Sequence, residues 1–248
     1  MVTSVAMSVE KRNTLLAAMT DEVAELVLHN NVSQSLASSL DDARSREAVG
    51  DFAAVITAFE RESSLERTAE GIPRTEEIAA RAEGGMGLTR PTLCVLLAYA
   101  KLNAGARLLA SSLPDDPATR EYLVHYFPPQ AVAAAGAERL DGHRLRREII
   151  TTYLINDLVD LMGSSFLHRV ARETGREIDQ VVRAWFIASR ISGAEALRED
   201  LERLELKGEH ATDTIYRWLF GLARVLDRTT RWVLNNVAPT ASSTAVIE

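Results

Sequence analysis

Residues 84–102 read GGMGLTRPTLCVLLAYAKL, and this stretch decides the fold that we expect for the chain. Thr89 is a favourable residue for the position before a helix, and Pro91 falls in the first turn, where its missing N–H group does no harm. Leu88 and Leu93 then occupy the two positions of a hydrophobic staple, which fixes how the chain enters a helix. The stretch therefore predicts a helix that begins after Thr89 and buries an apolar side.

The glycine cluster at 84–87 also suggests a loop that cradles phosphate, an alternative that requires specific neighbours. A Walker loop needs Lys and then Ser or Thr after its last glycine, whereas this chain has Leu88, Thr89 and Arg90. A dinucleotide fingerprint needs the spacing G-x-G-x-x-G between a strand and a helix, and the sequence has neither the spacing nor the strand. These residues favour a helix start over a nucleotide site.

Apolar residues recur at helical spacing along most of the chain, and no alternating run between turn signals predicts a strand. We therefore expect an all-α fold, an irregular bundle of about 8–11 helices with no sheet. The apolar stripes are Leu15, Met19, Val23, Leu26 and Val27; Phe52, Val55, Ile56 and Phe59; Leu93, Leu96, Leu97, Ala100 and Ala104; Leu145, Ile149 and Tyr153; Val182, Trp185 and Phe186; and Ile215, Leu219, Leu222, Leu226 and Val233.

Charge divides the chain into an acidic first part and a balanced second part. The net charge of −7 belongs to residues 1–88, with 15 acidic and 8 basic residues, whereas the rest has 20 of each. We expect an acidic helical subregion at 1–88, a main helical bundle at 89–236 and a disordered tail at 237–248, which is small and polar. The sequence leaves open whether Met1 is a natural start.

The composition also indicates which partners and which cellular compartment to expect. The sequence lacks the cluster of excess basic residues that a nucleic-acid partner would require. It also lacks the stretch of about 18 apolar residues that a membrane span would require. The single cysteine, Cys94, permits no internal disulfide and fits a reducing cytoplasm, where we expect the protein. Because Cys94 adjoins an apolar stripe, we interpret it as a small buried residue.

Two acidic pairs raise the possibility of a helical magnesium enzyme, since hard cations prefer several carboxylate oxygens. Asp41 and Asp42 are followed by no third carboxylate, and the segment with Asn156 and Asp157 also lacks a full ligand set. The five histidines show no metal-binding spacing. These residues are better interpreted as helix caps or helix faces, and no metal site is predicted.

One helical segment, HRLRREIITTYLINDLVD, is dense in polar residues. Arg144 lies four residues before Glu148, and Arg147 lies four residues before Thr151, a spacing typical of a solvated helix face. An arginine cluster could alternatively bind a carboxylate or contact another domain. Arg144, Arg147, Asn156 and Asp157 are therefore candidates for a polar cluster or interface.

The last predicted helix carries the longest apolar repeat. Leu219, Leu222, Leu226 and Val233 alternate by three, four and seven, which is close to the heptad spacing of a helix–helix contact. We expect these four residues to be candidates for a contact with a partner.

Four segments of the sequence resemble segments of a known protein family. RNTLLAAMTDEVAELVL, GLTRPTLCVLLAYAKL, LPDDP with YFPP, and HRLRREIITTYLINDLVDLMG occur in an order that resembles the C-terminal part of the large bacterial NAD-dependent glutamate dehydrogenases. The resemblance runs from Lys11 to Asn236 and is strongest from Gly87 to Gly163. Thr92 stands where the family often has Glu, so the reciprocal bond of a capping box is not expected at this helix start.

The resemblance implies a non-catalytic helical region of a very long enzyme, which oxidatively deaminates L-glutamate to 2-oxoglutarate and ammonium while it reduces NAD. NAD would bind in the catalytic module, and the region in hand would have no cofactor, catalytic or metal residues of its own. Its partners would be the catalytic module of the same polypeptide or other subunits. An independent helical interaction or scaffold protein of the same ancestry is the alternative, with the magnesium enzyme as a third.

Overall fold

The computed structural model describes residues 7–239 and 241–247, and each regular element among them is helical. Met1 and two positions of the expected disordered tail, 240 and 248, lie outside the described residues. The α-helices are α1 (Val9–Ala18), α2 (Thr20–Glu47), α3 (Val49–Glu62), α4 (Thr75–Glu83), α5 (Arg90–Ala110), α6 (Arg120–Tyr126), α7 (Pro129–Ala135), α8 (Ala137–Leu140), α9 (Arg146–Met162), α10 (Phe166–Thr174), α11 (Ile178–Ser192), α12 (Ala194–Lys207), α13 (Thr212–Asn236) and α14 (Ser243–Ile247); the 3₁₀ helices η1 (Leu113–Asp115) and η2 (Pro117–Thr119) join α5 to α6.

The predicted all-α class is confirmed for the described residues, which contain fourteen α-helices and no strand. This number exceeds the expected range of about 8–11, because several helices are too short to show a 3.6-residue repeat in the sequence. Helices α6 and α7 have seven residues each, α14 has five and α8 has four.

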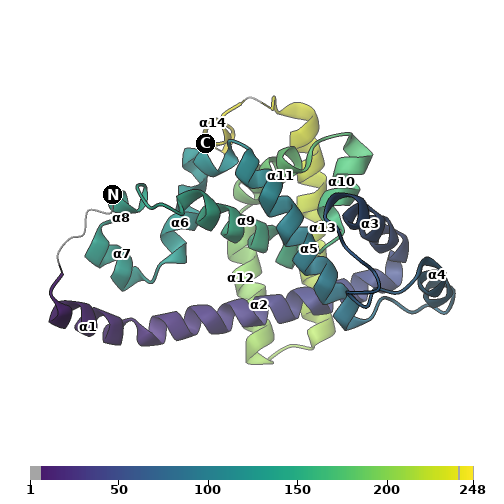
Figure 1. Cartoon of the computed structure of the whole chain (residues 1–248), viewed down its shortest axis with the longest axis horizontal. Coiled ribbons are helices and arrows are strands. Elements are labelled where there is room, and N and C mark those ends of the chain that lie inside the picture. Colours follow the sequence, from purple (N-terminus) through teal and green to yellow (C-terminus); the bar gives the residue numbers. More distant parts are fainter. Residues whose placement is uncertain (1–6, 240, 248) are drawn as a thin grey trace.

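Helices α5, α9, α11 and α13 form the middle of the bundle, while α1 and α2 run across the lower part of Figure 1, with the connection of α12 to α13 below α2. Helix α11 packs on α13 and places Trp185 and Phe186 in the core, and α5 packs on α9. By length and composition α5 could also cross a membrane, the one helix among the described residues that could. Its apolar side chains Leu93, Leu96 and Leu108 line the core, which accounts for its composition.

The start of α5 agrees with the prediction from residues 84–102. Thr89 is the residue before the helix, and the staple residues Leu88 and Leu93 are both buried. The Thr89 side chain makes no capping bond to the backbone; its hydroxyl instead lies 3.0 Å from that of Thr92. The glycine cluster therefore leads into a core helix, as the helix-start interpretation requires.

Gly87 has a more specific role than that of flexible punctuation. A Cβ atom at this position would lie 2.2 Å from Ser45 Oγ and 3.0 Å from the backbone nitrogen of Arg46. The next residue, Leu88, donates its N–H to Ser45 Oγ at 3.0 Å. The end of α2 therefore lies directly against the entrance to α5, and only a residue without a side chain fits between them.

Asp41 fastens α2 to the turn between α9 and α10. Its side chain is fully buried, and one carboxylate oxygen accepts hydrogen bonds from Ser164 N at 3.0 Å and from Ser164 Oγ at 2.7 Å. The other oxygen pairs with Arg44 at 3.2 Å. A Cβ atom on Gly163, whose φ is +87°, would lie 2.2 Å from Asp41 Oδ1, so this close approach also requires glycine.

The expected boundary at residue 88 does not interrupt the packing. One cluster of buried apolar residues runs from Leu36 in α2, through Phe59 in α3 and Leu93 in α5, to Leu234 in α13. The acidic subregion, from Leu36 onward, therefore shares its core with the main bundle. Apart from Asp41, none of the acidic residues that the structure describes there is buried.

One expectation, the burial of Cys94, is corrected by the structure, and the tail expected at 237–248 contains a short helix. Residues 243–247 of the expected disordered tail form α14, which packs on α11, and Arg183 donates a hydrogen bond to the carbonyl oxygen of Ala241. Ser243 is fully buried there. Cys94 is exposed, because it lies about 100° around the helix from the buried Leu93.

Candidate interaction surface

The four residues predicted from the near-heptad spacing lie inside the chain. Leu219, Leu222, Leu226 and Val233 are between 0% and 7% exposed. They lie on the side of α13 that packs on α11 and α12. Packing within the chain therefore accounts for the spacing, and these side chains are not on a surface that a partner would meet.

A different side of α13 carries exposed apolar residues. Trp218 is 46% exposed, Val225 is 51% exposed and Trp232 is 56% exposed. They are seven residues apart and thus share one side of the helix, beside the buried seam. We call these three residues the outer α13 stripe. Two half-exposed tryptophans in line are unusual on a water-facing helix, because Trp is highly buried on average.

A second exposed apolar surface lies on α1 and the first half of α2. Leu16, Val23 and Val27 are 53%, 43% and 55% exposed. The sequence predicted that Val23 and Val27 face a core, but the first half of α2 meets little of the chain besides α1. Its nearest tertiary partner there is α7, whose Gln130 hydrogen-bonds to Glu22 at 3.1 Å.

The predicted arginine pair is split between two roles. Arg144 lies in the exposed turn before α9, so it cannot form the expected helical pair with Glu148. Arg147 donates to the carbonyl oxygens of Leu109, at 2.7 Å, and Ser111, at 2.9 Å. It thereby satisfies free carbonyl groups at the end of α5, a structural task that its spacing to Thr151 did not indicate.

Asp157 joins three helices, and both it and its neighbour Asn156 are partly buried. One carboxylate oxygen of Asp157 accepts a hydrogen bond from Tyr122 of α6 at 3.1 Å, and the other pairs with Arg198 of α12 at 2.5 Å. Arg198 also pairs with Glu202 at 2.6 Å. Burial raises the pKa of Asp157, and the positive charge of Arg198 opposes that rise.

A neighbouring pair links α5 to α9. Asp160 is 5% exposed, and its Oδ1 lies 2.7 Å from Nζ of Lys101. Burial raises the pKa of the Asp160 carboxyl, against the opposing charge of Lys101. The carboxylates at 157 and 160 are thus both held by cations. Among the described residues, no group of three or more His, Cys, Asp or Glu side chains could hold a metal ion.

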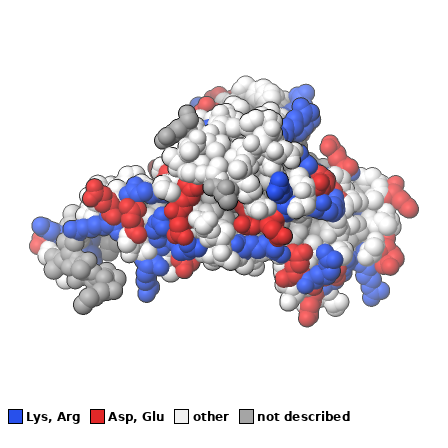
Figure 2. All heavy atoms as spheres, turned by 90° about the horizontal axis from the view of Figure 1, so that it is seen from above, with Lys and Arg blue, Asp and Glu red and all other residues white. Residues whose placement is uncertain are grey.

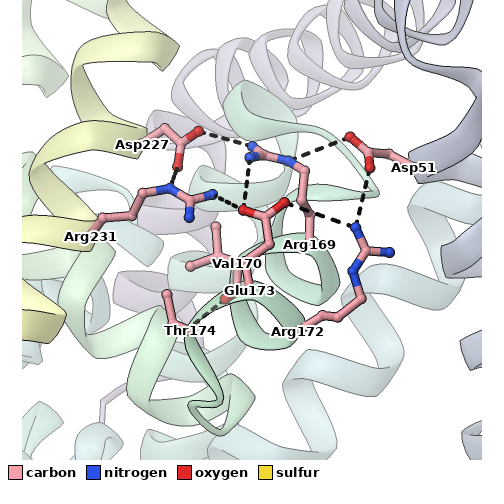
Figure 3. Close-up of polar contacts among 8 residues, drawn as sticks. All are labelled: Asp51, Arg169, Val170, Arg172, Glu173, Thr174, Asp227 and Arg231. Carbon is pink, nitrogen blue, oxygen red and sulfur yellow. Dashed lines mark hydrogen bonds and ion pairs between the residues drawn. The ribbon is translucent and has the colours of Figure 1, made fainter.

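A further polar network connects α3, α10 and α13 (Figure 3). Arg169 of α10 lies 3.0 Å from Asp227 of α13 and 3.7 Å from Asp51 of α3. Arg231 continues the network with bonds to Asp227 at 2.8 Å and to Glu173 at 2.7 Å. Beside this network lies a cleft of about 450 Å³ between α3, α10 and the start of α11.

Charges are mixed on the face of the molecule that Figure 2 draws. Figure 2 shows basic and acidic residues interspersed along the face that it draws, without a single basic field. The cleft beside the network differs, because five of its lining residues are arginines and three are carboxylates.

Sequence reasoning missed the outer α13 stripe and the arginine cleft, although both leave a signal. Trp218, Val225 and Trp232 repeat every seven residues, and Arg169, Arg172 and Arg176 repeat by three and four. The leucine repeat on α13 is the stronger pattern, and it marks the buried side of that helix. The cleft also needs Arg61 and Arg107 from distant helices, which no local spacing brings together.

Comparison with known proteins gives the family. A family model described as "Glutamate dehydrogenase, C-terminal" matches residues 85–248, so it begins at the glycine cluster. The chain is 37% identical over 225 residues to an NAD-specific glutamate dehydrogenase of Halomonas elongata, and 34% identical over 230 and 235 residues to those of Pseudomonas aeruginosa and Mycobacterium tuberculosis. These matches cover 91%, 93% and 95% of this chain but 14% of each relative. The chain therefore belongs to the family of glutamate dehydrogenase C-terminal regions.

Proposed function

We propose that this chain is a non-catalytic helical region of an NAD-dependent glutamate dehydrogenase. The full enzyme would convert L-glutamate to 2-oxoglutarate and ammonium, with NAD bound in a catalytic module outside this chain. We further propose that the enzyme works in the cytoplasm, as an oligomer, in amino-acid catabolism. The helical region would brace the catalytic module or join subunits.

The outer α13 stripe carries this proposal. Complete burial of a tryptophan removes about 150–250 Å² from water, so covering the exposed half of each would remove roughly 100 Å². At about 25 cal/mol per Å², the two tryptophans would contribute about 5 kcal/mol to an interface. Since the chain spans 14% of the length of its relatives, a neighbour within the same enzyme is the simplest occupant.

The arrangement of the other candidate residues agrees with a structural role. Asp41, Arg147 and Asp157 each connect helices through hydrogen bonds or ion pairs within the chain. The seam residues of α13 form part of its core. The apolar surface on α1 and α2 offers a second place where the rest of the enzyme would pack.

The test is made in the full dehydrogenase with the double variant Trp218→Ser/Trp232→Ser. We expect a shorter half-life of glutamate-dependent NADH production on heating, and a change in subunit assembly if the stripe joins subunits. Trp218→Phe/Trp232→Phe should retain most of the native behaviour, because it keeps aromatic contact. Leu197→Ser, a control at a 50% exposed leucine of α12, should have little effect. Unchanged activity, half-life and assembly in the double Ser variant would refute the proposal.

A further inference from the structure

The cleft beside the α3–α10–α13 network has a charge that sets it apart from the rest of the chain. Its arginines come from three helices and one connection: Arg61 from α3, Arg107 from α5, Arg169 and Arg172 from α10, and Arg176 from the segment before α11. Three carboxylates line the same cleft, so the lining has a net charge of +2, whereas the whole chain has −7. Arginines are thus concentrated in a hollow of an acidic protein.

Internal ion pairs neutralise some of these arginines but not all of them. Arg169 is held by Asp227 and Asp51, Arg172 lies 3.5 Å from Asp51, and Arg107 lies 2.8 Å from Glu62. The guanidinium group of Arg61 lies 3.9 Å from a carboxylate oxygen of Glu62, and the Arg61 side chain is 74% exposed.

Arg176 is the second arginine with N–H donors that are free for a ligand. It donates to the carbonyl oxygen of Leu234 at 3.3 Å, and no carboxylate of the described residues lies within ion-pair distance of it. Arg61 and Arg176 are therefore the arginines of the cleft with the weakest pairing inside the chain. Each retains N–H donors for a further partner.

The remaining lining gives the cleft room and one additional polar group. Ala54, Ala58 and Ala171 present only methyl groups, so space remains between the arginines. His168 lines the cleft with its ring edge-on to Phe59, at 5.0 Å between centroids. Within the described part of the chain, this ring has no hydrogen-bond partner, so its nitrogens are available to a ligand.

We propose that this cleft binds a small organic or inorganic anion with at least two negative charges. Guanidinium groups bind phosphate and carboxylate oxygens through paired N–H donors, and the arginines here come from separate helices that surround one hollow. A cleft of about 450 Å³ admits a small molecule but no folded partner. Since α3, α5, α10 and the start of α11 all contribute, the bound anion would hold these elements together. This inference does not depend on the dehydrogenase activity.

The test uses the purified chain and two probes, inorganic pyrophosphate and succinate, with sodium chloride at matched ionic strength as the reference. We expect at least one probe to raise the melting temperature in a saturable manner, beyond the effect of the salt. The better probe distinguishes a phosphate ligand from a carboxylate ligand. The absence of any saturable effect from both probes would overturn the proposal.

Three variants locate the site. Arg61→Gln and Arg176→Gln should each weaken the apparent affinity by about fivefold or more, because each removes a charged hydrogen-bond donor. Ala54→Leu should weaken it by filling the hollow without any change of charge. Arg203→Gln, at an exposed arginine of α12, is the matched control and should retain native affinity. Equal affinity of Ala54→Leu and the native chain would place the anion elsewhere and refute the assignment.

Discussion

Replacement of Asp41 tests how α2 is held to the bundle. In Asp41→Ala, Ser164 loses the acceptor for its N–H and its hydroxyl, and Arg44 loses its ion-pair partner. The Arg44 side chain is only 17% exposed, so water replaces the lost carboxylate poorly. Breaking a buried pair in this manner costs about 3–5 kcal/mol of unfolding free energy.

That cost corresponds to a decrease in melting temperature of roughly 6–20 °C for a chain of this size. Asp41→Asn keeps the shape and one acceptor oxygen but turns an NH₂ group toward existing donors, so it should cost about 2 kcal/mol. Urea unfolding, followed by far-UV circular dichroism and by tryptophan fluorescence, to which the buried Trp185 contributes, measures both values.

The adjacent Asp42 provides the control. It pairs with Arg46 on an exposed helix face, and the two side chains are 35% and 62% exposed. Asp42→Asn should therefore change the unfolding free energy by no more than about 0.5 kcal/mol. The reasoning is refuted if Asp41→Ala stays within about 1 kcal/mol of the native chain.

Three further predictions concern glycine, histidine and catalysis. Gly87→Ala should destabilise the chain by about 1–3 kcal/mol in urea unfolding, because the added methyl group would meet Ser45. Gly221→Ala, in an open mid-helix position, should stabilise the chain by roughly 0.5–1 kcal/mol. A change of the same sign in both variants would contradict the geometry. Burial lowers the pKa of His168, so the unfolded chain binds a proton at higher pH than the folded chain, and stability should fall as pH drops below about 6.5. His168→Phe should make that decrease shallower, and parallel pH profiles for the two proteins would count against it. The purified chain should be folded, should produce no NADH from glutamate and NAD, and should not bind NAD in calorimetry. Clear NADH production by the chain, freed of host enzyme, would overturn this prediction.

The sequence predicted the helical class, and it located the start of α5 at Thr89. These features depend on local spacing, which a sequence displays directly. The short helices α8 and α14 could not be predicted in this way, because their stability comes from contacts with distant residues. The burial of Ser243 in α14 is such a contact, which the small polar residues of 237–248 do not reveal in the sequence.

The candidate residues show the same division. The repeat of Leu219, Leu222 and Leu226 correctly indicated an apolar seam, but spacing alone does not say whether the partner of a seam is another helix of the same chain. Asp157 was identified as a polar residue of α9, yet its partners Tyr122 and Arg198 lie 35 and 41 residues away. The cleft arginines were not predicted, because three helices far apart in the sequence bring them together.

Hydroxyl-radical footprinting of the full dehydrogenase and of the isolated chain would test the central claim most directly. Trp218 and Trp232 are about half exposed here, whereas Trp185 is 1% exposed and serves as an internal reference that should react slowly in both samples. We predict that Trp218 and Trp232 are oxidised readily in the isolated chain and are protected severalfold in the full enzyme. Equal oxidation of both tryptophans in the two samples would show that the outer α13 stripe faces water in the enzyme, and would contradict the proposed role.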